Sequence, residues 1–146
     1  MRRLRTVLAR RLRTVLVALT VVAAVATAGS LWFSLGLGLT PCRLCWYQRI
    51  LMYPLVVVLG VASVEDRPRA WLTALPLSLG GVAVAAYHSY LQVAPSPAQT
   101  CSIGGESCVR IQYSMADGLL TIPRLSLVAF VLLSVGLVGV ARFDGA

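Results

Sequence analysis

The sequence predicts an all-α integral membrane protein, a four-helix bundle with its N-terminus and C-terminus in the cytoplasm. The first indication is composition: 58% of the 146 residues are hydrophobic and only 12% are charged, against about 25% charged in a typical soluble domain. The second is that four long stretches contain no charged residue at all. The third is that most arginines lie on one side of these stretches, which is the usual orientation signal of a membrane protein.

The four uncharged stretches are long enough to supply spanning helices, which need about 20 apolar residues each. They run over Thr14–Cys42, Ile50–Val64, Ala70–Gly105 and Leu125–Ala141. The first and third reach this length unaided, whereas the second and fourth must extend into their flanks. We therefore expect one membrane domain over residues 1–146, with spans at about 15–37, 43–64, 70–93 and 123–141.

The net charge of +8 is distributed unevenly along the chain, and all 13 cationic residues are arginines. Nine of them precede the first span, lie between spans two and three, or follow span four, and only four lie toward the other side. This positive-inside bias places both chain ends and the 65–69 loop in the cytoplasm. A basic surface can also bind nucleic acid, but orientation accounts for this charge, so we expect no nucleic-acid partner.

The N-terminal segment also resembles a cleavable secretory signal, because arginines are followed by the apolar stretch Val15–Ala26 and by Ala26-Thr27-Ala28. The apolar character continues to Leu39, however, which is longer than the hydrophobic region of a cleaved signal. We favour an uncleaved first span, with cleavage as the alternative.

The second span is expected to begin at a pair of cysteines. Gly36 and Gly38 interrupt the first helix, Thr40 is a candidate N-cap, and Pro41 suits the first helical position. A helix from about Cys42 to Val64, rising about 1.5 Å per residue, can cross an apolar core of roughly 30 Å. A helix from Ile50 alone could not, so Cys45 and Arg49 are expected in the outer membrane interface.

The third span ends in polar aromatic residues near the same interface, among them His88. A long loop then runs over about 94–121 and contains Cys101 and Cys108. With the 38–45 segment, this gives two cysteine-bearing loops, both on the extracytoplasmic side of the predicted topology.

Two cysteine pairs therefore face an oxidising compartment. Cys42 and Cys45 form a Cys-x-x-Cys pair at a predicted helix N-terminus, where backbone amides favour the thiolate and the disulfide is comparatively easy to reduce. Cys101 and Cys108 are separated by six residues. We expect these four cysteines to be catalytic and to exchange disulfides.

Two other interpretations of the cysteines remain open. Four cysteines could form two static disulfides, although Cys-x-x-Cys is a poor structural staple. They could also bind zinc, but six intervening residues exceed the two to four that structural zinc sites use, and an oxidising compartment favours disulfides. We therefore assign no metal ligand from the sequence.

Arg49 and His88 are the candidate cofactor-binding residues. Arg49 lies four residues after Cys45, hence on the same helix face, and a charge at this depth suggests function. A quinone fits the site, since a guanidinium can bond its carbonyl oxygens, although Arg49 could instead extend toward lipid headgroups. His88 could donate protons to a reduced quinone, or only bond a neighbouring helix.

These segments resemble the disulfide bond formation protein B (DsbB) family, including its short BdbC-like branch. The segment Pro41-Cys42-Arg43-Leu44-Cys45-Trp46-Tyr47-Gln48-Arg49 is similar to the motif at the start of that family's second span. Tyr87-His88-Ser89-Tyr90-Leu91-Gln92, followed by Pro95-Ser96-Pro97 and Cys101, is similar to its third-span exit and second redox loop. The resemblance extends over nearly the whole chain.

The resemblance implies a bacterial inner-membrane oxidase that passes electrons from an extracytoplasmic thioredoxin-fold (DsbA-like) dithiol protein to ubiquinone or menaquinone. By the same resemblance, the partner attacks Cys101, Cys108 is released and attacks Cys42, and Cys45 is left as the thiolate nearest the quinone. The chain departs from larger members in one respect: only six residues separate Cys101 from Cys108. A relay then requires the loop to reach Cys42 directly.

Two alternative functions remain at this point. A vitamin K epoxide reductase-like enzyme also combines four helices with a Cys-x-x-Cys beside quinone, but its active motif is expected near the end of the last helix, where this chain has no cysteine. A non-enzymatic membrane subunit with structural disulfides is the other alternative.

Overall fold

The computed structural model describes residues 2–94 and 107–144, and it is almost entirely helical. Helix α1 (Arg2–Leu31) continues into the π-helical segment η1 (Trp32–Gly36), and α2 (Arg43–Val64) follows. The 3₁₀ turn η2 (Pro68–Ala70) leads into α3 (Trp71–Val93), and α5 (Ile122–Asp144) closes the described chain. Before α5, the strands β1 (Ser114–Met115) and β2 (Leu120–Thr121) form a small antiparallel hairpin.

Four helical stretches of the described residues are long and apolar enough to cross a membrane. They are Arg3–Gly36, Arg43–Val64, Pro68–Val93 and Ile122–Asp144. The predicted four-helix membrane bundle is therefore confirmed. The cytoplasmic location of the two chain ends stays a prediction from the distribution of the arginines.

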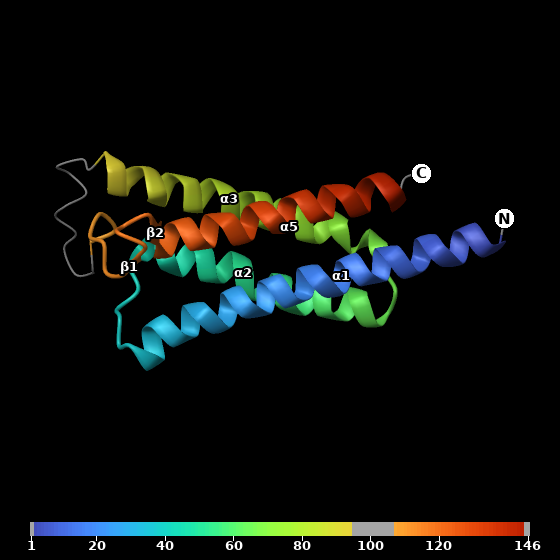
Figure 1. Cartoon of the computed structure of the whole chain (residues 1–146), viewed down its shortest axis with the longest axis horizontal. Helices are drawn as coiled ribbons and strands as arrows, with labels where there is room; N and C mark the ends of the chain where they lie inside the picture. Colours follow the sequence, from blue (N-terminus) through green and yellow to red (C-terminus); the bar gives the residue numbers. More distant parts are fainter. Residues whose placement is uncertain (1, 95–106, 145–146) are drawn as a thin grey trace.

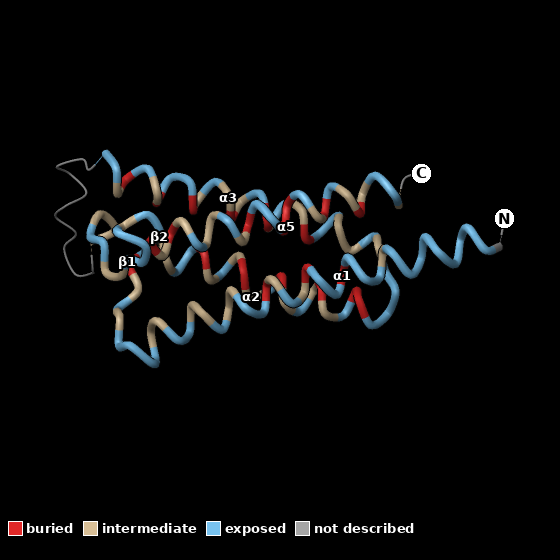
Figure 2. The backbone as a smooth tube through the Cα atoms, in the orientation of Figure 1, coloured by how far each residue is buried: buried red, intermediate tan, exposed pale blue. Residues whose placement is uncertain are grey.

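The bundle brings both chain ends to one end of the molecule and the α1–α2 connection and the hairpin to the other (Figure 1). Helix α1 packs against α2 and α5, and α3 packs against α2 and α5. Figure 2 shows that buried positions face the inside of the bundle, where Leu16, Leu55, Phe130 and Leu137 are almost inaccessible. The outward positions are apolar as well, as expected for surfaces that contact lipid.

Helices α3 and α5 approach each other closely at a glycine. A Cβ atom built on Gly81 would lie 2.1 Å from Cε1 of the fully buried Phe130 ring. Near this point, the Ser78 hydroxyl lies 3.1 Å from the Phe130 carbonyl oxygen, to which it donates, and 2.7 Å from the Ser134 hydroxyl. Small residues and interhelical hydrogen bonds are the usual means of helix association in a membrane.

The structure corrects two expectations about local structure. Thr40 and Pro41 are not the N-cap and the first helical residue of α2, because Cys42 is the N-cap, with an extended backbone whose carbonyl accepts from the Trp46 amide. The segment predicted as a plain loop contains the β1–β2 hairpin. Its turn uses Ala116, Asp117 and Gly118, all with positive φ.

Candidate active site

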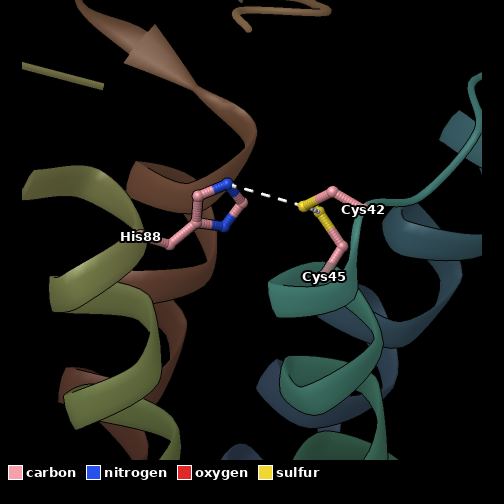
Figure 3. Close-up of side chains that lie close together, drawn as sticks. All are labelled: Cys42, Cys45 and His88. Atoms are coloured by element: carbon pink, nitrogen blue, oxygen red, sulfur yellow. Dashed lines mark hydrogen bonds between the residues drawn. The ribbon is translucent and has the colours of Figure 1, made fainter. Parts of the chain in front are cut away.

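The Cys-x-x-Cys pair lies at the end of the bundle opposite the chain termini, at the first turn of α2. The Sγ atoms of Cys42 and Cys45 are 3.1 Å apart, within hydrogen-bonding distance, and both are free thiols. Cys42 is 4% exposed, whereas Cys45 is half-buried. Figure 3 shows the two sulfur atoms side by side and facing the His88 ring.

His88 joins this pair from α3. Its ring is 3% exposed, and Nε2 lies 3.7 Å from Cys42 Sγ. Nδ1 lies 3.1 Å from the amide nitrogen of Gln48, which is also buried. Because the Gln48 amide donates to Nδ1, Nε2 carries the ring hydrogen and donates it to the Cys108 carbonyl oxygen at 3.2 Å. Gln48 therefore fixes the tautomer and orientation of His88.

Cys108 is held over the N-terminus of α2. Besides the bond from His88 to its carbonyl, its sulfur interacts electrostatically with Cys42 and with the backbone amides of Leu44 and Arg43. Amides at a helix N-terminus are natural donors to an anion such as a thiolate. Cys108 thus lies beside Cys42, since His88 Nε2 contacts both residues.

Two further contacts tie the segment after Cys108 to the neighbouring elements. The Gln112 amide donates to the Thr40 carbonyl at 2.8 Å, just before α2. The Tyr113 ring packs on Phe33 of η1, with ring centroids 5.1 Å apart. The loop is thereby attached on both sides of the Cys-x-x-Cys pair.

The thiols that lie outside the spanning helices are strongly protonated in this arrangement. Hydrogen bonding to Cys45, together with burial, raises the pKa of Cys42 from 9.0 to about 12. Burial raises the pKa of Cys108 from 9.0 to about 11, and the neighbouring Cys42 adds to this effect. In this fully reduced arrangement Cys42 acts as a hydrogen donor toward Cys45.

Arg49 lies on α2 one turn beyond Cys45 and is clamped by α1. Its Nε donates to the Ser30 hydroxyl at 2.9 Å, and its Nη2 donates to the Ser30 carbonyl at 2.8 Å and to the Ser34 hydroxyl. The guanidinium carbon is 5.4 Å from the centre of the Trp46 ring, a cation–π contact. The charge also interacts electrostatically with the Cys45 sulfur.

A cavity of about 450 Å³ lies beside Arg49, between α1, α2 and α5. Its walls are mostly aliphatic, and Cys45, Gln48 and Arg49 supply polar groups at its cysteine end. Figure 1 shows the C-terminal end of α1 diverging from the other helices toward this end of the bundle. Among the lining residues, Val25 of α1 and Val128 of α5 are 65% and 54% exposed, so the cavity opens on the lateral surface of the bundle.

The structure gathers most of the residues predicted from the sequence. Cys42, Cys45, His88 and Cys108 form one cluster, and Cys45 is the member that also lines the cavity with Arg49. Cys101 lies outside the described residues. Sequence reasoning gave no role to Gln48, Ser30 or Ser34 and assigned Tyr53 to packing at the interface. The position of Gln48 directly before Arg49 in the Cys-x-x-Cys segment was a signal that could have been used.

Comparisons with known proteins identify the family to which the chain is similar. The family described as "Disulfide bond formation protein DsbB" matches residues 10–140. Disulfide bond formation protein C of Bacillus subtilis is 43% identical over 77% of this chain and 82% of its own length. Probable disulfide formation proteins of Metapseudomonas resinovorans and Oceanobacillus iheyensis are 35% and 37% identical, over 83% and 88% of this chain and 85% and 89% of their own lengths.

No solved structure matches the chain. The family match covers all four helices and both described cysteine segments, and it agrees with the resemblance found in the sequence. Membership of this family, together with four helices able to span a membrane, makes the chain a multi-pass membrane thiol–disulfide oxidoreductase. The chain belongs to the disulfide bond formation protein DsbB family.

Proposed function

We propose that the chain is a quinone-dependent thiol oxidase of the bacterial inner membrane, which reoxidises an extracytoplasmic thioredoxin-fold dithiol protein. The observation that carries the proposal is the position of Cys45. Its sulfur contacts Cys42 on one side and lines the cavity that holds Arg49 on the other. The two cysteines of one motif thus face two different surroundings, a protein loop and a lipid-accessible cavity.

A quinone headgroup fits the residues of this cavity. The volume of about 450 Å³ is within the roughly 300–1,000 Å³ of small-molecule sites. The hydroxyl oxygen of Tyr53, which lines the cavity, is buried and has no hydrogen-bond partner within the described part of the chain. A buried hydroxyl without a partner is costly, and a carbonyl oxygen in the cavity would satisfy it. Lateral access through α1 and α5 suits a lipid-soluble molecule.

Two side chains would hold the quinone ring. Arg49 and Tyr53 would donate to its oxygen atoms. Trp46 would support them by keeping the Arg49 guanidinium in place. A bound quinone supplies an acceptor for two electrons and two protons. Arg49 favours a negative charge on Cys45 because the two groups interact electrostatically at the apolar end of α2.

The protein steps are disulfide exchanges among the four cysteines. A partner thiolate attacks Cys101 of the Cys101–Cys108 disulfide, and Cys108 leaves as a thiolate. The Leu44 and Arg43 amides that face its sulfur would stabilise this charge. Cys108 then attacks Cys42 of the Cys42–Cys45 disulfide, because Cys42 is the residue of that pair with which Cys108 interacts more closely. Cys45 is released beside the cavity.

The second half of the exchange restores the loop and completes the electron balance. The partner's second thiol first attacks its own sulfur in the mixed disulfide, which oxidises the partner and releases Cys101 as a thiolate. Cys101 then attacks Cys108, which re-forms the loop disulfide and releases Cys42, so one partner dithiol is oxidised for each reduced Cys42–Cys45 pair. These two thiols then hold the two electrons and two protons that pass to the acceptor.

Quinol formation tests the proposal directly. Purified chain in detergent is mixed with a reduced thioredoxin-fold protein and either ubiquinone or menaquinone, and absorbance of the quinone is followed without oxygen. We expect turnover with the unaltered chain and none with Cys45→Ser. Partner oxidation that proceeds equally without quinone, or no quinol in any mixture, would contradict the proposal.

Arg49→Lys separates quinone binding from disulfide exchange. A lysine cannot reproduce the forked contacts to Ser30 and Ser34, so we expect the KM for quinone to rise about tenfold, the equivalent of roughly 1.4 kcal/mol. The exchange between the chain and its partner, measured in a single turnover without quinone, should be unchanged. Arg43→Lys, at an exposed arginine of the same helix, is the matched control.

A further inference from the structure

Three soft metal-ligand atoms of the redox site lie together at the end of the bundle, an arrangement that disulfide exchange alone does not require. Cys42 Sγ, Cys45 Sγ and a ring nitrogen of His88 all fall within 4.8 Å of one another. Figure 3 shows the His88 ring facing the two sulfur atoms. We propose that the reduced chain binds one Zn²⁺ ion through these three atoms, and that the ion holds the cysteine pair in its dithiolate form.

The geometry of the three atoms is close to that of a zinc site. With zinc bonds of about 2.3 Å to sulfur and about 2.05 Å to nitrogen, tetrahedral ligands lie about 3.8 Å apart for two sulfurs and about 3.6 Å apart for sulfur and nitrogen. The observed separations are 3.1 Å between the sulfurs and 3.7 Å between Cys42 Sγ and His88 Nε2. Shifts well below the length of one bond would therefore bring these atoms to coordinating positions.

His88 already has the outer partner that zinc-bound histidines usually have. A metal on Nε2 requires the ring hydrogen on Nδ1, and Nδ1 faces the buried Gln48 amide at 3.1 Å. A flip of that amide presents its oxygen as the acceptor and keeps the contact. Such outer hydrogen bonds fix the tautomer and orientation of ligand histidines. The cost is the bond from Nε2 to the Cys108 carbonyl, which coordination replaces.

The charge balance also suits the location. Two thiolates neutralise Zn²⁺ and the imidazole is neutral, so the occupied site carries no net charge where Cys42 and His88 are almost fully buried. Three protein ligands leave a fourth position open for a water molecule. Oxidation of Cys42 and Cys45 to a disulfide removes both anionic ligands, and the ion leaves with its charge unchanged.

Redox dependence makes this site distinct from a structural zinc site. Only the reduced pair can coordinate, so binding competes with reoxidation of the pair. Zinc would then slow the oxidase by stabilising Cys42 and Cys45 as thiolates, while leaving the Cys101–Cys108 exchange untouched. The proposal does not depend on the identity of the electron acceptor, because coordination requires only the reduced cysteines and His88.

The test uses metal binding and needs neither partner nor quinone. The full chain with Cys101→Ala and Cys108→Ala, which removes the other pair, is reduced under argon in detergent and titrated with Co²⁺ and then with Zn²⁺ against a chromophoric chelator. We expect one equivalent of metal, with the thiolate-to-cobalt charge-transfer band and the visible absorption of tetrahedral cobalt. The same variant with Cys42 and Cys45 oxidised should bind none.

Two substitutions on α3 complete the test. His88→Ala should weaken zinc binding at least tenfold, whereas Ser89→Ala, at the next residue, should leave it unchanged, because that hydroxyl donates to the Ala85 carbonyl of its own helix. Helix content by circular dichroism shows that each variant is folded. No charge-transfer band in the reduced chain, or equal affinity in its oxidised form, would overturn the proposal.

Discussion

Gln48 is the residue through which α2 controls His88. Its buried amide lies 3.1 Å from Nδ1, and this bond leaves Nε2 as the donor to the Cys108 carbonyl. A neutral histidine without such a partner can exchange between its two tautomers. Gln48 is thus a positioning residue: it sets the hydrogen bond that keeps Cys108 above Cys42 without itself touching a sulfur.

We expect Gln48→Leu to slow the exchange between the two cysteine pairs about five- to tenfold, the equivalent of one lost hydrogen bond of about 1 kcal/mol. Rapid-mixing measurement of a single turnover with the reduced partner checks the rate. The ¹⁵N shifts of the His88 ring should move toward a mixture of tautomers, which general destabilisation would not produce. An unchanged ring spectrum would contradict a positioning role. Gln48→Glu, which replaces the amide donor with an acceptor and should move the ring hydrogen to Nδ1, is the comparison.

The raised pKa of Cys108 predicts how the reduced protein responds to alkaline pH. Burial raises this pKa from 9.0 to about 11. Between pH 9 and 11 the unfolded chain has lost a Cys108 proton that the folded chain still binds. The stabilisation from this group is therefore complete below pH 9 and is lost as pH rises toward 11.

Alkylation of Cys108 by iodoacetamide, followed by peptide mass spectrometry, measures this directly. The rate in the folded, reduced chain should rise with pH around a midpoint near 11, because only the thiolate reacts. In guanidinium chloride the midpoint should fall to about 9, the ordinary thiol value. A folded midpoint at or below 9 would show that Cys108 is not buried against Cys42 in solution.

The sequence indicated the residues with distinctive chemistry and did not indicate those that position them. Cys42, Cys45 and Arg49 stand out because thiols and a charge are unusual beside a membrane span. Ser30 and Ser34 do not stand out, since serine is common in spanning helices and their contacts with Arg49 depend on how α1 and α2 are aligned. The alignment of two helices depends on how they pack, and the sequence pattern of one helix does not predict it.

At the scale of elements, the helices were predictable and the irregular segments beside them were not. Uncharged length identified all four helices, but the π-helical segment Trp32–Gly36 and the two-residue strands of the hairpin have no sequence period long enough to reveal them. The π-helical segment matters for the site because it contributes Ser34 to the Arg49 clamp. π-Helical turns are often found at functional sites.

The contact between α3 and α5 gives a prediction about stability. Gly81→Ala would place a methyl group 2.1 Å from the buried Phe130 ring, so we expect a loss of about 1–3 kcal/mol in the free energy of unfolding. Gly80→Ala, at the neighbouring glycine, meets only Leu51 at 3.7 Å and should change stability by about 0.5 kcal/mol at most. Denaturation in mixed micelles, followed by circular dichroism, compares the two.

The ring contact itself can be checked by a second substitution. Phe130→Leu removes Cε1 and Cζ, two of the three ring atoms that the new methyl group would meet, so the double variant should recover part of the loss caused by Gly81→Ala. Equal stability of the Gly81→Ala and Gly80→Ala variants would show that α3 and α5 do not pack through Gly81.

At the scale of the whole molecule, the fold places both chain ends at one end of the bundle and the cysteine cluster at the other (Figure 1). The four spans and the meeting of both cysteine segments at one end of the bundle follow from composition and helix order, whereas the family follows from the residues around the cysteines and His88. The side of the membrane that each end of the bundle faces is set when the chain inserts, and the arginine distribution predicts it.

The arginine distribution therefore predicts the topology of the chain in cells. Nine arginines accompany the chain ends and the α2–α3 connection, and four accompany the cysteine end, so the termini should face the cytoplasm. A green fluorescent protein fused after Ala146 should be fluorescent, and alkaline phosphatase fused at the same position should be inactive. In intact cells treated with a reductant, a membrane-impermeant maleimide should label the half-buried Cys108. Active phosphatase at Ala146 would show that the orientation is the opposite one. The cysteines would then face the reducing cytoplasm, where the proposed exchange with an extracytoplasmic partner could not occur.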